Sequence, residues 1–405
     1  MENDARKTLI GEAIGHALHD TWFGVTPVLL AAVSTSLALS NSDIGLMLLC
    51  YQAVSSITQP FFGRMAERLG GRVLAVGAIL WTTLLFTGAL FAPTKLLLGA
   101  CIALAGFGSG AFHPQGTANA TVSGGQRYGA TAASLFFFGG TLGTAFVGSA
   151  LGGFLIGQFG RQSLVSISVL IVILTLTVVR RMVPRELSQH QEGDKAQPQA
   201  RNGAAKGAAW AIIVVLLASI AFRSLAQHTL NTYIPKYYQD LGVMPAIYGL
   251  LLSLFLAATA TGGVLGSFLG DRIGFQRVVA GSLLLTALAL FGFMRLDGLA
   301  GQACFVLTGL FLGPSHTLLL VSGQRRFPQR MAMMSGIFLG FTFVSGAGGA
   351  WLLGLLADRI GLGAALGLLP IPLVAGAICA WIAVPSERAR ERTREAEAAA
   401  LEIPS

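Results

Sequence analysis

Charged residues are scarce in this chain of 405 residues, making up 11% of it, while 54% belong to the hydrophobic set. A soluble protein of this length needs a polar exterior, and so few charged side chains could cover it only sparsely. The shortage of charge therefore excludes an ordinary soluble globular protein. Most of the apolar surface is expected to face lipid.

Cysteine is also rare, and its placement excludes several kinds of site. The four cysteines, Cys50, Cys101, Cys304 and Cys379, fall within apolar stretches, form no CxxC pair and have no histidine at metal-ligand spacing. We therefore expect no disulfide framework, no metal site and no cofactor. The motifs GxSxG and HExxH are missing too, which argues against a membrane-embedded enzyme. A non-transporting sensor would usually carry a folded soluble domain, and no segment is long enough for one.

What the chain has instead is a series of twelve apolar stretches, each long enough to cross a hydrocarbon core of about 30 Å. They cover residues 9–39, 42–62, 73–91, 96–118, 129–155, 163–183, 208–233, 246–269, 278–294, 301–322, 331–356 and 363–384. This pattern predicts an all-α integral membrane protein with twelve transmembrane helices. A polar segment in the middle of the chain divides these helices into two sets of six.

The predicted domain boundaries follow from that polar segment, which is rich in Gln, Pro, Asp and Asn and cannot bury a core. We expect an N-terminal six-helix bundle over 1–183, a cytoplasmic linker over 184–207, a C-terminal six-helix bundle over 208–384 and a charged cytoplasmic tail over 385–405.

The basic residues predict the orientation, because loops rich in Lys and Arg stay in the cytoplasm. With both termini inside, 21 of the 27 basic residues lie in inner segments, five lie in outer loops and Arg223 lies within a span. The net charge of +9 then meets anionic lipid headgroups, and no nucleic-acid partner is needed. The expected location is the inner (cytoplasmic) membrane of the cell.

The two halves contain a repeated turn. The chain reads GRMAERLGG at 63–71 and SFLGDRIGF at 267–275, so that Glu67 and Arg68 correspond to Asp271 and Arg272 at an offset of 204. At a helix end, these carboxylates can accept backbone N–H groups or pair with Arg of a neighbouring helix, which predicts a gate on the cytoplasmic side. The alternative is that both strings make ordinary polar turns.

The repeated acidic-Arg-x-Gly turn, the twelve spans and the polar linker together resemble the major facilitator superfamily over essentially the whole chain. The strings HALHDTWFGVTPVL (16–29), FHPQGTANATVSGGQRYG (112–129) and SGIFLGFTFVSGAGGAWLLGLLADRIG (335–361) are similar to its fosmidomycin-resistance efflux branch. The resemblance implies two pseudo-symmetric bundles and proton-driven extrusion of a small molecule by alternating access. Its partners would be the substrate, protons and the lipid bilayer, and we expect a monomer. Import of a small organic anion or metabolite by proton symport is the alternative.

Asp20 is the main candidate for proton coupling, because an ionisable side chain inside a span usually marks a pathway or relay. It lies about 16 Å beyond the start of the first stretch, near the membrane midplane. His16 precedes it by four residues on the same helix face, and His19 lies on the same side. Together these residues can hold and pass a proton. The alternative is that they are buried polar groups that only support helix packing.

Arg223 in the seventh stretch needs a negative partner, because an unpaired guanidinium inside the membrane is costly. Asp20 and an anionic group of the substrate are the two candidates, so Arg223 could switch between them. It could instead extend to the interface or sit in a structural ion pair.

The remaining predicted substrate contacts are polar or aromatic side chains in the spans. His113 and His316 occupy matched positions near Pro114 and Pro314, where a broken helix exposes backbone groups to a cavity. The other predicted contacts are Gln115, Asn119, Gln227, Trp22 and Phe23. The run Phe136 to Phe138 suits lipid contact as well as a cavity wall, since three consecutive residues cannot share one helix face.

Overall fold

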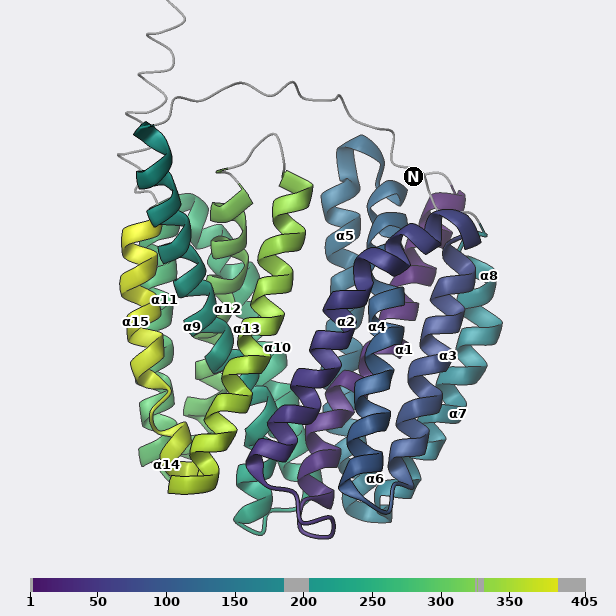
Figure 1. Cartoon of the computed structure of the whole chain (residues 1–405), viewed down its shortest axis with the longest axis horizontal. Helices are drawn as coiled ribbons and strands as arrows, with labels where there is room; N and C mark the ends of the chain where they lie inside the picture. Colours follow the sequence, from purple (N-terminus) through teal and green to yellow (C-terminus); the bar gives the residue numbers. More distant parts are fainter. Residues whose placement is uncertain (1–2, 186–203, 325, 327–330, 385–405) are drawn as a thin grey trace, which may run out of the picture. The chain divides into compact units, whose positions relative to one another are not determined.

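The computed structural model describes residues 3–185, 204–324, 326 and 331–384, and the regular elements in these ranges are all helices (Figure 1). Residues 186–203 of the predicted linker and the predicted tail, 385–405, lie outside the described residues. The helices are α1 (Asn3–Val33), α2 (Asn41–Leu69), α3 (Gly71–Leu90), α4 (Lys95–Ser123), α5 (Gly125–Leu142), the π-helix η1 (Gly143–Leu151), α6 (Gly152–Phe159), the 3₁₀-helix η2 (Arg161–Leu164), α7 (Val165–Leu174), the π-helix η3 (Thr175–Val179), α8 (Arg180–Met182), α9 (Ala204–Asp240), α10 (Pro245–Ile273), α11 (Phe275–Arg295), α12 (Gly298–Gln324), α13 (Met331–Ile360), α14 (Leu362–Leu366) and α15 (Pro370–Ala383).

These helices confirm the predicted all-α membrane fold. Among the described residues, ten helical segments are long and apolar enough to cross a membrane. The first two predicted spans form α1 and α2, helices of 31 and 29 residues whose polar content is higher. Both exceed the length of about 20 residues that a membrane crossing requires. Several helix ends differ from the approximate predicted bounds. The first helix ends at Val33 and not near residue 39, because a turn follows in which Ala38 has a positive φ of 49°.

The described residues form two compact units. One contains those of Met1–Lys195 together with His228–Ala257 and Ala347–Ala365, and the other contains those of Ala196–Gln227, Ala258–Gly346 and Leu366–Ser405. The units therefore do not follow the predicted bundle boundaries, and the division into two six-helix bundles stays a prediction.

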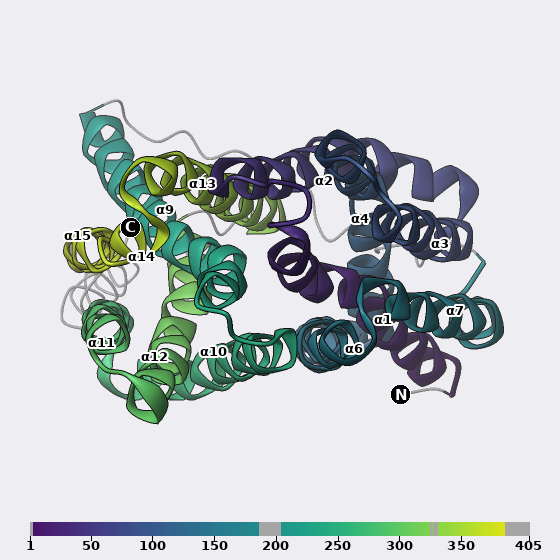
Figure 2. The ribbon, with the colours of Figure 1, turned by 90° about the horizontal axis from the view of Figure 1, so that it is seen from below.

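In the first unit, α4 packs against α2 and α3 (Figure 2). Helix α1 packs against α4, α5 and η1. Close approach of α1 to η1 depends on glycine. A Cβ on Gly24 would lie 2.0 Å from the carbonyl oxygen of Thr144, and one on Gly143 would lie 2.0 Å from that of Ala17. Glycine lets the two backbones touch here, as is common between membrane helices.

In the second unit, α11 packs against α12 and α15. Gly262 of α10 lies so close to α12 that a Cβ would come within 1.9 Å of the carbonyl oxygen of Leu310. Helix packing through glycine thus recurs in both units.

The repeated turns have the same local structure in both halves. Gly70 ends α2 with φ of 85° and Gly274 ends α10 with φ of 93°. In each case the glycine N–H donates to the carbonyl oxygen four residues earlier. A positive φ favours glycine at a helix end, which explains why both strings finish with it. A third such turn ends α13 at Gly361, with φ of 87°.

Candidate functional site

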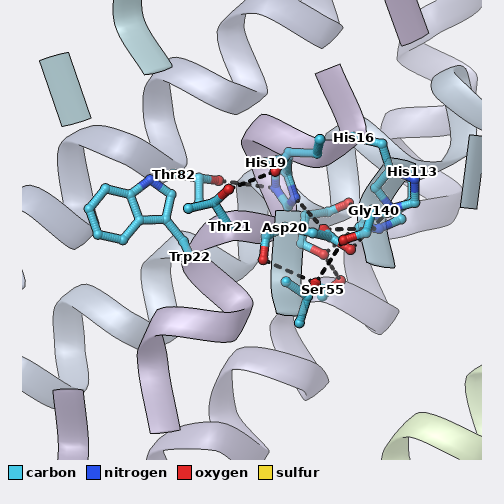
Figure 3. Close-up of polar contacts among 12 residues, drawn as sticks. His16, His19, Asp20, Thr21, Trp22, Ser55, Thr82, His113 and Gly140 are labelled. Carbon is cyan, nitrogen blue, oxygen red and sulfur yellow. Dashed lines mark hydrogen bonds and ion pairs between the residues drawn. The ribbon is translucent and has the colours of Figure 1, made fainter. Parts of the chain in front are cut away.

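The site is centred on Asp20, around which three histidines gather (Figure 3). His16 Nε2 lies 3.1 Å from Asp20 Oδ2, and His19 Nδ1 lies 2.9 Å from Oδ1. His113 of α4 contributes from the neighbouring helix, with Nε2 3.7 Å from Oδ1. The predicted group of His16, His19 and Asp20 is therefore a real cluster, and His113 belongs to it as well.

Hydrogen positions in this cluster follow from the partners of each ring. His16 Nδ1 lies 2.8 Å from the carbonyl oxygen of Phe136, which can only accept, so Nδ1 carries a hydrogen. The 3.1 Å contact from Nε2 to Asp20 then needs a second proton, held by either residue. His19 needs no extra proton, because Nδ1–H donates to Asp20 and Nε2 accepts from Thr82 Oγ1 at 3.3 Å. One exchangeable proton thus lies between His16 and Asp20.

Aromatic rings hold the histidines in place. Phe136 stacks on His16 with ring centroids 4.1 Å apart, and Phe112 stacks on His19 at 5.1 Å. Phe136 is fully buried, whereas Phe137 and Phe138 are exposed. Phe136 therefore lies inside the site, and the ring of the exposed Phe137 also contacts that of His16, with centroids 5.8 Å apart. Lipid contact of this run stays a prediction.

Gly140 of α5 leaves the space that the His16 ring occupies. A Cβ at this position would lie 2.6 Å from His16 Nε2 and 2.7 to 2.8 Å from two ring carbons. Real Cβ atoms do not approach that closely, so any larger residue would displace the ring. Gly140 is thus part of the geometry that sets the His16–Asp20 contact.

The cluster is reached from one side. The His16 and His19 side chains are 3% and 0% exposed, while those of Asp20 and His113 are 20% and 26% exposed. His16, Asp20 and His113 also present ligand atoms within 4.8 Å of one another, a spacing that a cation can use. The proton shared by His16 and Asp20 already supplies a positive charge between two of these ligand atoms.

A second buried carboxylate, Glu12, lies two turns before Asp20 on α1 and was missed in the sequence. Glu12 is fully buried, and its Oε1 accepts a hydrogen bond of 2.7 Å from Asn119 Nδ2. Gln115 Nε2 donates to Oε2 at 3.4 Å. The predicted substrate contacts Gln115 and Asn119 are thus engaged with a carboxylate inside the first unit. The four-residue spacing of Glu12, His16 and Asp20 was the available signal.

The aromatic pair Trp22 and Phe23 has two different surroundings. Trp22 is fully buried, donates from Nε1 to Thr83 Oγ1 at 3.2 Å and stacks on Phe86, which leaves it no surface for a substrate. Phe23 instead lines a cavity of about 470 Å³ in the first unit. Polar side chains of the same cavity include those of Gln52 and Asn231.

Arg223 lies in the second unit beside a smaller cavity of about 210 Å³, which His316 also lines. The Arg223 side chain is buried, and Nη2 donates to Gln227 Oε1 at 3.0 Å. The ion pairs recorded within the described ranges do not include Arg223. Arg223, Gln227 and His316 therefore share one unit, and the predicted pairing of Arg223 with Asp20 stays a prediction.

The predicted gate residues lie at the expected helix ends. Arg68, Asp271 and Arg272 are exposed, and the ion pairs of the described part of the chain do not include them. The side chain of Glu67 lies outside the described part of the structure. Their gating role stays a prediction.

A carboxylate that accepts helix N–H groups does occur, but at the opposite ends of the helices. Asp358 of α13 accepts from the backbone N–H of Asn41 at 2.8 Å and of Ser42 at 3.0 Å, and from Asn41 Nδ2 at 3.0 Å. These are the first N–H groups of α2, where a negative charge is favourable. The string ADRIG at 357–361 repeats the acidic-Arg-x-Gly pattern and could have identified this residue.

Comparison with known proteins adds a family and a fold. The sequence matches the model of the Major Facilitator Superfamily over residues 13–243 and 216–404. It is 29% identical over 355 residues to the fosmidomycin resistance protein of Escherichia coli, covering 86% of this chain and 85% of that protein. It is 28% identical over 360 residues to the uncharacterized MFS-type transporter YfnC of Bacillus subtilis, covering 87% of each. A bacterial homologue of the human lysosomal transporter Spinster, in an inward-facing and occupied conformation, is similar in structure with a TM-score of 0.72 and 16% identity, covering 93% of this chain and 94% of that one.

Proposed function

This chain belongs to the major facilitator superfamily, and we propose that it exports a small polar or drug-like molecule in exchange for protons. As a member of that superfamily it is a multi-pass membrane transporter of a small molecule and not an enzyme. We further propose that it acts as a monomer with both termini in the cytoplasm, as the basic residues indicate. The finer assignment to proton antiport depends on the Asp20 cluster.

The exchangeable proton between His16 and Asp20 carries this proposal. The charge of Asp20 changes with that proton, and a change of charge inside a span alters which conformation is favourable. Asp20 and His113 are partly exposed, so protons can reach the cluster, while His16 and His19 hold the carboxylate from the buried side. The E. coli relative that resembles this chain is named for fosmidomycin resistance, which supports export.

The energy source is tested in sealed vesicles with an imposed proton gradient. We expect a protonophore to abolish transport, because the gradient drives the cycle, and ATP depletion at fixed gradient to leave it intact. The chain has no GxxxxGK[ST] motif for ATP. Unchanged transport in the presence of the protonophore would contradict proton coupling.

The direction is tested in the same vesicles with a panel of antibiotics and small organic anions. An exporter accumulates its substrate in inside-out vesicles with an acidic lumen. Uptake only into right-side-out vesicles with an acidic exterior would instead identify proton symport into the cell.

Gly140→Ala is expected to lower proton-driven transport by roughly tenfold or more, because small misplacements at a reactive site have large effects. The added methyl group must displace the His16 ring and break its contact with Asp20. The matched control is Gly77→Ala on α3, where a Cβ meets nothing within 4 Å. Equal transport in the two variants would show that the His16 position does not matter.

Asp358→Ala is expected to favour conformations open at the outer ends of the helices. The substitution removes the acceptor for two N–H groups of α2, a loss of about 1 kcal/mol, which corresponds to a several-fold shift in population. The measurement is alkylation from outside of a cysteine introduced at Gln52, in a background without the native cysteines. Asp240→Ala, at an exposed ion pair with Lys236, is the control. An unchanged labelling rate would show that the Asp358 contact is only structural.

The predicted gate at the cytoplasmic turns is tested by labelling from the inner side, in contrast to the outer ends probed with Asp358→Ala. We expect Glu67→Gln and Asp271→Asn to favour the inward-open form, since both remove a charge from the proposed gate. Cysteines introduced along the inner half of the cavity should then be alkylated faster. Rates equal to those of the parent would support ordinary polar turns.

A further inference from the structure

We infer that the cavity beside Arg223 is a binding site for one oxyanion group of the transported molecule. The inference rests on the proposed function and deepens it, because it names the chemistry of the substrate. It depends on two buried side chains, each of which has one polar atom without a hydrogen-bond partner among the described residues.

Arg223 supplies the first of these. Its side chain is 4% exposed, and it donates from Nη2 to the neutral amide oxygen of Gln227, while Nε has no hydrogen-bond partner within the described part of the chain. A guanidinium carries five N–H donors in a planar fork that matches two oxygen atoms of an anion. Burying it inside a span without a counter-charge is costly, so the position favours an anionic ligand.

Ser224, the next residue, supplies the second. Its Oγ is buried and finds no hydrogen-bond partner among the residues that the structure describes. Serines within helices usually donate to the carbonyl oxygen four residues earlier, as Ser267 and Ser322 do here at 2.9 and 2.7 Å. The hydroxyl of Ser224 is therefore left for another acceptor, and the structure places it on the same cavity as Arg223.

The composition and size of the cavity suit one end of an anionic molecule. Ser315, His316 and Thr342 add polar groups to the lining, Leu319 and Phe338 add apolar surface, and none of the described lining residues carries a carboxylate that would repel an anion. The apolar residues lower the local dielectric constant, which strengthens a charge-assisted hydrogen bond. The cavity is small, with an empty volume of about 210 Å³ that includes space open to its surroundings. Its polar donors suit a single charged group.

The test is anion binding to the purified full chain in detergent, without transport. Thermal unfolding is followed during titration with sodium phosphate or sodium acetate, with sodium chloride holding the ionic strength constant. A ligand of the folded state raises Tm as its concentration exceeds Kd. We expect a rise with phosphate, acetate or both, removed by Arg223→Met and moved to about tenfold higher concentration by Ser224→Ala. Ser267→Ala, which loses a hydroxyl already bonded to the backbone, should behave as the parent.

The two anions separate the possible substrates. A rise with phosphate alone assigns a tetrahedral oxyanion, and a rise with acetate alone assigns a carboxylate. No rise with either anion, or an equal rise in the parent and Arg223→Met, overturns the inference. Arg223→Lys, which keeps the charge but not the planar fork, gives a second variant and should bind more weakly. The protonophore experiment tests the proposed function separately, since it does not depend on anion binding.

Discussion

Asp20→Asn is expected to reduce proton-driven transport at least a hundredfold. The amide preserves the size of the side chain but has neither a charge nor the ability to exchange the proton shared with His16. Since the proposed cycle depends on that change of charge, the variant should lose coupling and still bind substrate. Transport in sealed vesicles with an imposed gradient gives the first measurement, and anion-dependent thermal unfolding gives the second.

A matched control separates this effect from the loss of any carboxylate. Asp240→Asn removes an exposed carboxylate paired with Lys236 and should keep transport within about twofold, because exposed ion pairs contribute little. Asp20→Asn must also unfold at a temperature close to that of the parent. Gradient-driven transport that persists in a folded Asp20→Asn protein would exclude Asp20 as the coupling residue.

Much of the Asp20 cluster could be predicted from spacing along one helix. His16 and Asp20 are four residues apart, so a helix brings them to one face, and the structure confirms their contact at 3.1 Å. The spans themselves were predictable for a related reason, since a run of apolar residues long enough to cross the membrane must satisfy its backbone groups as a helix. Periodicity within one segment is sufficient for both results.

Contacts between helices could not be predicted in this way. His113 joins Asp20 from α4, and Asn119 of the same helix binds Glu12 of α1, because these two helices pack against each other. Spacing along the chain carries no information about which faces of two helices meet. Trp22 shows the same limit, since its ring packs on Phe86 and not on a cavity.

The acidic turns illustrate a different limit. The internal repeat draws attention to Glu67 and Asp271, which match at a constant offset, whereas Asp358 has the same local string without that offset. In the described residues, Asp358 is the member of this group that accepts backbone N–H groups of another helix. A motif identifies the chemistry that a residue can perform, but the tertiary neighbour decides whether it does so.

Arg223→Met is expected to make the protein more stable and inactive. Removing a buried guanidinium that forms no ion pair with the described residues should raise the free energy of unfolding by about 1–4 kcal/mol, because an apolar side chain of similar length avoids the desolvation cost. The hydrogen bond to Gln227 is lost, at a cost of about 1 kcal/mol, which is smaller. Thermal unfolding without added anion measures the gain, and vesicle transport measures the loss of function.

Arg223→Gln is the control, since it removes the charge but keeps a polar group that must remain buried, and it should gain less stability. If Arg223→Met unfolds at a lower temperature than the parent, Arg223 has a stabilising partner and contributes to packing. Its buried charge would then not be available to bind a substrate.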